Sequence, residues 1–293
     1  ISDDATLREE ALWYAIVSLD RAFERGFKSV VEQRDRLATV YLQAFPATDR
    51  AAQLLLRRID EGLLTDAQAI AVLLDVPSES PLYEAARRHA SRLMYRKYRG
   101  SRGPERDFAA ARFMEVAEEL INIDTAIVRN GSREQSEQAA EFVVLRVRQA
   151  LDAALTITVP DLPRAERLLT VLDDVAAFAG IDLAPVDGEL AYRRLQIALA
   201  KDDPDAIGIA TAALHGTEGV HARSGDRLLY QHAVDRWQSK PTDTELALRV
   251  VASGSRVLDQ FRPLADHKDD RTVVGLVNTL AAAATAAWRG DDD

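Results

Sequence analysis

The chain of 293 residues contains no cysteine. This absence excludes disulfide bridges, thiolate zinc sites, iron–sulfur clusters and cysteine nucleophiles together. The sequence also lacks the glycine-rich phosphate-binding motifs G-x-x-x-x-G-K-[ST] and G-x-G-x-x-G, the H-E-x-x-H motif and an EF-hand loop. Only five histidines are present. We therefore expect no metal, no cofactor and no catalytic residues of a familiar class.

Long apolar runs are scarce as well. The most apolar stretch, "TVVGLVNTLAAAATAAW" at residues 272–288, contains Asn278, Thr279 and Thr285. It is shorter than the roughly 20 residues that a helix needs to cross a bilayer. We expect a buried C-terminal helix rather than a membrane span. The first residues, "ISDDATLREE", do not form an apolar signal region, and we expect a cytoplasmic protein.

Strand-like alternation occurs only in "LTITVP", residues 155–160. This segment is too short to build a sheet and ends on a proline. We interpret it as an extended connector between two helical halves, residues 1–155 and 161–293, which may pack as one continuous domain.

Helical periodicity dominates the rest of the chain. Near the N-terminus, apolar residues recur at three- and four-residue steps, which places them on one stripe of a helix that ends near Gly26. The members of this stripe are Leu12, Ile16, Leu19, Phe23 and Phe27.

Helix start and stop signals divide the chain further. Thr65 with Gln68 and Ser132 with Gln135 have the spacing of capping boxes. Pro104, Pro163 and Pro204 fit the first turn of a helix. Twelve breaks lie near Gly26, Pro46, Gly62, Pro77–Pro81, Gly100–Pro104, Asn130–Gly131, Pro160–Pro163, Gly180–Gly188, Asp202–Pro204, Gly216–Gly219, Lys240–Pro241 and Pro263–Asp270. They predict about thirteen helices.

Short connectors between consecutive helices favour antiparallel hairpins. The sequence therefore predicts an all-α fold, either an α-solenoid or a multi-helix bundle. In residues 190–214, small and apolar side chains resemble the second helix of a tetratricopeptide (TPR) hairpin; they are Ala206, Ala210, Ala213 and Leu214. Arg193 and Arg194 depart from that pattern in the first helix, so the TPR-like resemblance covers one hairpin.

One spacing resembles that of HEPN-type ribonucleases, in which an arginine is followed four to six residues later by a histidine. Arg227 and His232 have this Arg-x4-His spacing. Leu228 stands where that family usually places a polar residue, and an arginine-rich chain contains such pairs by chance.

The most unusual feature is a basic block in an acidic protein. Residues 87–106, "RRHASRLMYRKYRGSRGPER", contain eight Lys or Arg and a single carboxylate, a local charge of +7 within a net charge of −10. A helix over residues 82–99 places its apolar side chains on one face and most of its cations on the other. Cations in its last turn complement the helix dipole.

The next helix begins around Pro104 and is expected to return along the first. Equal distances from the turn then predict ion pairs of Arg88 with Glu115 and of Arg96 with Asp107. The other cations and two tyrosines form a hairpin tip, which interleaves arginine with aromatic rings as RNA-binding surfaces do. The candidate binding residues are Arg88, Arg92, Tyr95, Tyr98, Arg99 and Arg102.

Three interpretations of the basic block remain: a solvated or internally paired face, a surface for an acidic protein, and a nucleic-acid contact. We favour a protein without catalytic activity of its own that binds another protein as an adaptor. An RNA- or DNA-associated factor that uses residues 88–102 is the alternative. A helical ribonuclease using Arg227 and His232 is the second alternative.

Overall fold

The computed structural model describes residues 2–45, 48–60, 64–80, 82–262, 264–267 and 270–290. These residues form thirteen α-helices and three short 3-10 helices, with no strand among them. The all-α class and the predicted number of helices are confirmed. The predicted breaks at Pro46, Gly62, Pro81 and Pro263 lie outside the described residues.

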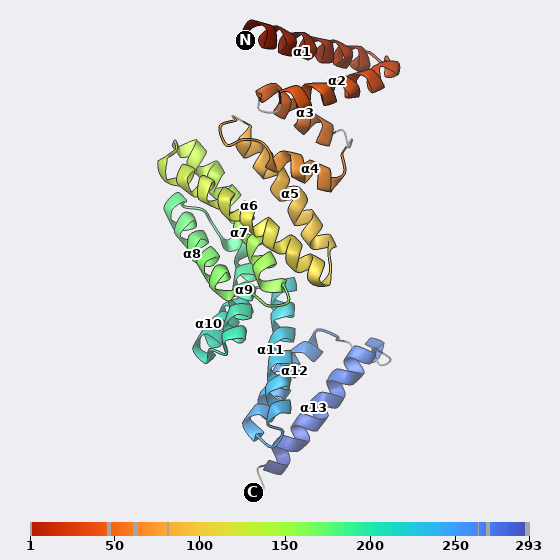
Figure 1. Cartoon of the computed structure of the whole chain (residues 1–293). Helices are drawn as coiled ribbons and strands as arrows, with labels where there is room; N and C mark the ends of the chain where they lie inside the picture. Colours follow the sequence, from red (N-terminus) through yellow and green to blue (C-terminus); the bar gives the residue numbers. More distant parts are fainter. Residues whose placement is uncertain are drawn as a thin grey trace. The chain divides into compact units, whose positions relative to one another are not determined.

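Contacts divide the chain into two compact units, Ile1–Pro160 and Asp161–Asp293 (Figure 1). The first contains α1 (Ser2–Glu24), α2 (Val31–Ala44), α3 (Asp49–Asp60), α4 (Asp66–Leu74), α5 (Tyr83–Gly100), α6 (Gly103–Asn130) and α7 (Arg133–Thr156). The second contains α8 (Leu162–Ala179), α9 (Asp187–Lys201), α10 (Pro204–His215), α11 (Val220–Ser239), α12 (Thr244–Asp259) and α13 (Arg271–Gly290).

In the first unit, helices pack mainly against their neighbours in the chain, as in the α5–α6 and α6–α7 hairpins. Fully buried alanines at Ala110, Ala117, Ala140 and Ala150 face the packed interior of α6 and α7. Such small side chains let the axes of two helices approach closely. The α6–α7 hairpin, the longest of the unit, is therefore closely packed. A separate cluster around Ile16, Tyr41 and Leu54 joins α1, α2 and α3.

The predicted stripe of α1 is correct at Ile16, which is fully buried, and wrong at Phe27, which is 62% exposed. The helix ends at Glu24, and Gly26 has a φ of +96°. This left-handed residue turns the chain, so Phe27 no longer continues the helical face.

The predicted helix starts are confirmed in atomic detail. Both capping boxes form, with the side chains of Thr65 and Ser132 each accepting a backbone N–H three residues later. Pro104, Pro163 and Pro204 each occupy a first-turn position.

The predicted extended connector begins later than expected. Leu155 and Thr156 still belong to α7, and Ile157 is the first residue with extended backbone. The Thr156 hydroxyl donates a hydrogen bond of 2.6 Å to the carbonyl of Asp152, and Leu155 is buried. Packing and this bond within the last turn outweigh the alternating pattern.

In the second unit, α9 packs against α10 and α11, and α12 packs against α11 and α13. The hairpin of residues 190–214 forms, with Ala210 and Leu214 buried against Leu195. Gly225 of α11 is also buried, and a β-carbon there would collide with Leu214. A glycine at this position therefore permits the close approach of α11 to α10.

The C-terminal helix α13 is buried on one face only. Val273, Leu276 and Ala283 pack inward, whereas Val274 is 43% exposed and Trp288 is 69% exposed. The prediction of a buried helix is thus wrong for its outer face, because among the described residues α13 packs chiefly against α12 and, through Ala283 and Ala287, against the cluster that also contains Ala233 and Val234 of α11. No helix in the described ranges has the length and apolarity required to cross a membrane.

Candidate functional site

Helix α5 carries most of the basic block, and it packs against both α4 and α6. Its cations therefore meet carboxylates from several elements. Arg88 donates to both carboxylate oxygens of Asp124 on α6, and the bond from Nη1 to Oδ2 measures 3.0 Å. Arg96 donates to Asp66 at the start of α4, with a distance of 2.7 Å from Nη2 to Oδ1.

The predicted pairs of Arg88 with Glu115 and of Arg96 with Asp107 are therefore wrong. A helical side chain points toward the N-terminus of its own helix. In an antiparallel hairpin, this direction carries Arg88 past Glu115 to the later residue Asp124. Arg96 lies on the face of α5 that meets α4, and Asp107 instead accepts a hydrogen bond of 3.1 Å from the backbone N–H of Thr158.

Three of the predicted tip residues converge on one carboxylate, Asp152 of α7. Tyr95 and Arg99 donate to its Oδ2 at 3.3 and 3.0 Å, and the Tyr98 hydroxyl lies 3.2 Å from the same Oδ2 and 3.1 Å from the backbone carbonyl of Asp152. Tyr98 is fully buried, so its ring is not a surface on which a base can stack. Burial, assisted by the charge of Asp152, raises the pKa of Tyr95 to about 12.

Arg92 and Arg102 remain exposed on the surface. Arg92 lies 3.2 Å from Nδ1 of His89. Arg102 forms no ion pair with any residue for which the structure gives a position. Of the six predicted binding residues, these two face solvent without a carboxylate partner.

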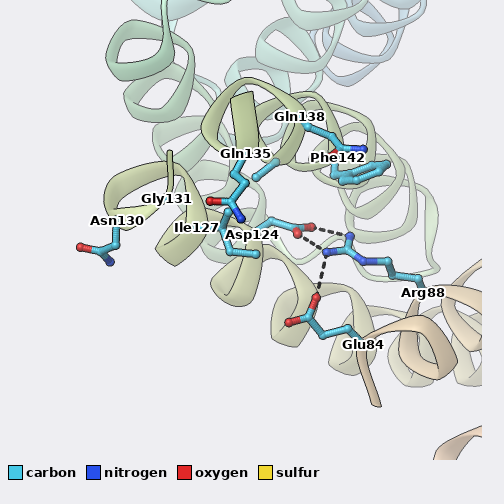
Figure 2. Close-up of a pocket in the computed structure, with 10 residues that line it drawn as sticks. Glu84, Arg88, Asp124, Ile127, Asn130, Gly131, Gln135, Gln138 and Phe142 are labelled. Carbon is cyan, nitrogen blue, oxygen red and sulfur yellow. Dashed lines mark hydrogen bonds and ion pairs between the residues drawn. The ribbon is translucent and has the colours of Figure 1, made fainter. Parts of the chain in front are cut away.

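Arg88 lines a cavity of about 400 Å³ between α5, α6 and α7 (Figure 2). Glu84 and Arg88 come from α5, and Asp124 and Ile127 from α6, with Phe142 opposite them on α7. The other lining residues are Asn130, Gly131, Gln135, Gln138 and Ala139. The Arg88 guanidinium lies 4.7 Å from the centre of the Phe142 ring, which fixes it against one wall.

Asp124, which lines the cavity, binds two arginines, Arg88 of the lining and Arg146 outside it. Asp124 is fully buried, and Arg146 of α7, whose side chain is 8% exposed, donates to its Oδ2 at 3.2 Å. Burial lowers the pKa of Arg146 to about 10, an effect that Asp124 opposes and that Arg88 reinforces. The hydrogen bonds to Asp124 raise the pKa of Arg88. At neutral pH both arginines are charged and held by the same carboxylate.

When Arg146 is counted, the charges at this cavity sum to zero, because Arg88 and Arg146 are positive and Glu84 and Asp124 are negative. The lining nevertheless offers several hydrogen-bonding groups. Asp124 already neutralises a guanidinium, and Glu84 lies 3.6 Å from Arg88. Gln135 uses its carbonyl oxygen in the cap of α7, so its amide N–H groups are free to donate, and Gln138 adds a second amide. Ile127, Ala139 and Phe142 supply the apolar part of the lining.

Sequence reasoning named Arg88 but missed Asp124, Arg146 and Asp152. A signal for Asp124 is present, because it occupies the apolar stripe of α6 that also contains Leu120, Ile121 and Val128. A carboxylate on a buried stripe requires a partner, and this requirement could have pointed to a cation on a facing helix.

The structure does not bring Arg227 and His232 together. Arg227 donates to Gln260 at 3.2 Å and lies over the Phe261 ring. His232 lies 3.7 Å from Asp202. Residues five apart on a helix point about 140° away from each other, so the two side chains serve different contacts.

Among the described residues, no group of three or more histidine, aspartate or glutamate side chains is placed to hold a metal ion. In comparisons with known proteins, no family model, curated protein or solved structure matches this chain.

Proposed function

We propose that this protein is a non-catalytic adaptor that binds a segment of a partner protein in the Arg88 cavity. The observation that carries the proposal is the cavity of about 400 Å³ with its own charges already paired. Several apolar side chains and two glutamines line the same space.

The chemistry of the lining favours an uncharged peptide segment. A peptide group carries one N–H donor and one C=O acceptor, and both match the amides of Gln135 and Gln138. An apolar side chain of the segment would lie against Phe142 and Ile127, where burial of apolar surface supplies the favourable free energy. A charged ligand would gain less binding free energy. To pair with Glu84 or Arg88, it would have to compete with the contact that these two residues already make with each other.

The test is a selection from a random-peptide display library on the wild-type protein. We expect enriched peptides to share an uncharged core with at least one apolar side chain. They should lose binding to Gln138→Trp, whose indole would occupy the cavity. Glu141→Trp is the matched control, because Glu141 is an exposed residue of the same helix outside the lining.

The nucleic-acid alternative has its own arm in this experiment. Single-stranded and hairpin RNA are titrated against the wild type and an Arg92→Glu/Arg102→Glu variant. RNA binding that the variant abolishes, together with no enrichment of peptides, would replace the adaptor proposal by the alternative at the hairpin tip.

A further inference from the structure

Helix α13 carries a second line of apolar side chains beside the face that packs inward. Val274 and Val277 are each 43% exposed and Trp288 is 69% exposed, and two exposed alanines lie between Val277 and Trp288. The members of this line, which we call the α13 seam, are Val274, Val277, Ala281, Ala284 and Trp288. They recur at alternating steps of three and four residues, which is the spacing of the a and d positions in a coiled coil.

The surroundings of the seam are free of charge. Residues 272–288 contain no aspartate, glutamate, lysine or arginine, although these residues make up 29% of the chain. The solvent-facing side of a surface helix ordinarily carries charged groups. A partner that covers the seam therefore removes no charge from water, which avoids the largest cost of covering a helix surface, and the apolar side chains supply the favourable free energy.

The order of side-chain sizes matches the seam of a second copy in antiparallel orientation. With the two helices centred on Thr279, Val274 lies opposite Ala284 of the second copy. Val277 lies opposite Ala281 in the next layer. Each layer then contains one valine and one alanine, so one distance between the helix axes suits both layers.

A parallel pair of the same helices would fit less well. It would place valine on valine, alanine on alanine and tryptophan on tryptophan. These layers require different distances between the axes, and a pair held apart by its larger side chains leaves gaps between the alanines. The size order therefore favours the antiparallel pair, in which both copies use the same surface about a two-fold axis.

The same register gives Trp288 a polar partner. It places the indole opposite Asp270 of the second copy, which directly precedes the first residue of α13. The indole N–H group is a donor only. Asp270 accepts the backbone N–H of Thr272 at 2.8 Å with its Oδ1 atom, so its other carboxylate oxygen can accept the indole. Among the residues that the structure describes, Asp270 forms no ion pair that would compete.

We propose that two copies of this chain associate through the α13 seam, with the two helices antiparallel. This self-association goes beyond the adaptor function and uses a helix of the second unit, whereas the Arg88 cavity lies in the first. An interface one helix wide and about 21 Å long is smaller than the standard interface of about 1,600 Å². We therefore expect a dimer that dissociates on dilution.

Sedimentation equilibrium of the full chain at a series of concentrations tests the association. We expect the wild type to shift from monomer to dimer as the concentration rises. Ala281→Glu places a charge within the seam and should raise the dissociation constant at least about tenfold. Ala282→Glu is the matched control, because Ala282 is the neighbouring exposed alanine outside the seam, and it should associate as the wild type does. Circular dichroism verifies that both variants remain helical.

The absence of cysteine allows the orientation to be tested by crosslinking. Val274→Cys and Ala284→Cys proteins are treated with a short bis-maleimide, separately and as a mixture, and a tag on one of them distinguishes mixed from identical pairs by mass. We expect crosslinks between the two different proteins in the mixture. Each protein alone should give little product, because its two cysteines lie about 15 Å apart along the helix axis.

A wild type that stays monomeric at every concentration would overturn the inference, whatever other protein it binds in a cell extract. Equal association of Ala281→Glu and the wild type would overturn it as well, since the dimer would then use another surface. Crosslinks between identical copies, with none between the two different proteins, would reject the antiparallel pairing. None of these results depends on the Arg88 cavity, and Gln138→Trp should associate as the wild type does.

Discussion

Asp124 has an environment that few carboxylates occupy, because it is fully buried between two guanidiniums and within an alanine-rich hairpin. Among the residues that the structure describes, Arg88 and Arg146 form ion pairs with it. The same contacts hold Arg88 in place along the wall of the cavity, so a residue that never reaches solvent determines the shape of the proposed binding site.

Replacing Asp124 by alanine should destabilise the first unit by about 3–5 kcal/mol, since it leaves Arg146 charged and buried without a partner. Chemical denaturation monitored by circular dichroism measures this loss. In Asp124→Leu/Arg146→Met the charges are replaced by apolar side chains, and we expect much of the stability to return. A double variant that is no more stable than Asp124→Ala would show that the buried charge is not the cause.

Tyr95 should make stability depend on pH in the alkaline range. Its pKa is raised from 10.0 to about 12 by burial and by Asp152, so the folded state favours the neutral phenol. The corresponding stabilisation is complete below pH 10 and is lost as the pH rises toward 12. Because phenylalanine does not titrate, the stability of the wild type should fall relative to that of Tyr95→Phe as the pH rises from 10 toward 12. A constant difference between them from pH 8 to about pH 12 would contradict this assignment.

At the scale of helices, local signals in the sequence predicted the elements well. Capping residues and prolines act within one turn, and they predict where α4, α6 and α7 begin. The pairing of side chains was not predictable in the same way. Arg88 reaches Asp124 and not Glu115 because of side-chain direction and the packing of three helices, and neither is encoded in the spacing of the turn.

Two glycines of the second unit distinguish close packing from an open surface. A β-carbon at Gly254 of α12 would lie 2.5 Å from Leu280 and 2.9 Å from the Tyr230 ring, whereas one at Gly275 of α13 would have no neighbour within 4 Å. Gly254 therefore lies where three helices meet, and Gly275 lies on the free side of α13.

We expect Gly254→Ala to destabilise the protein, because overpacking costs about 1–3 kcal/mol and exceeds the helix-propensity gain. Gly275→Ala should stabilise it by about 0.5–1 kcal/mol, since alanine loses less conformational freedom in a helix. Thermal unfolding compares the two directly. Stabilisation by both substitutions would mean that α11, α12 and α13 pack more loosely than described.

At the scale of the whole molecule, most contacts fall within either Ile1–Pro160 or Asp161–Asp293. Within each unit the closely packed helices are mainly neighbours in the chain. The helices therefore form several local cores. In folds whose helices contact mainly their neighbours in the chain, the effect of a substitution remains near its site.

Hydrogen exchange measured by mass spectrometry tests whether the effect of a substitution remains within its own unit. Asp124→Ala should raise exchange in α5, α6 and α7 and leave α11, α12 and α13 unchanged, and Gly254→Ala should do the reverse. Equal increases in both units for either variant would show that they unfold as a single cooperative body.

We propose above all that the Arg88 cavity binds an uncharged peptide segment. The most direct measurement is calorimetric titration of one peptide selected on the wild type against the wild type, Gln138→Trp and Glu141→Trp. We expect Gln138→Trp to weaken the affinity by at least about tenfold and Glu141→Trp to bind as the wild type does. Equal affinity for all three proteins would contradict it.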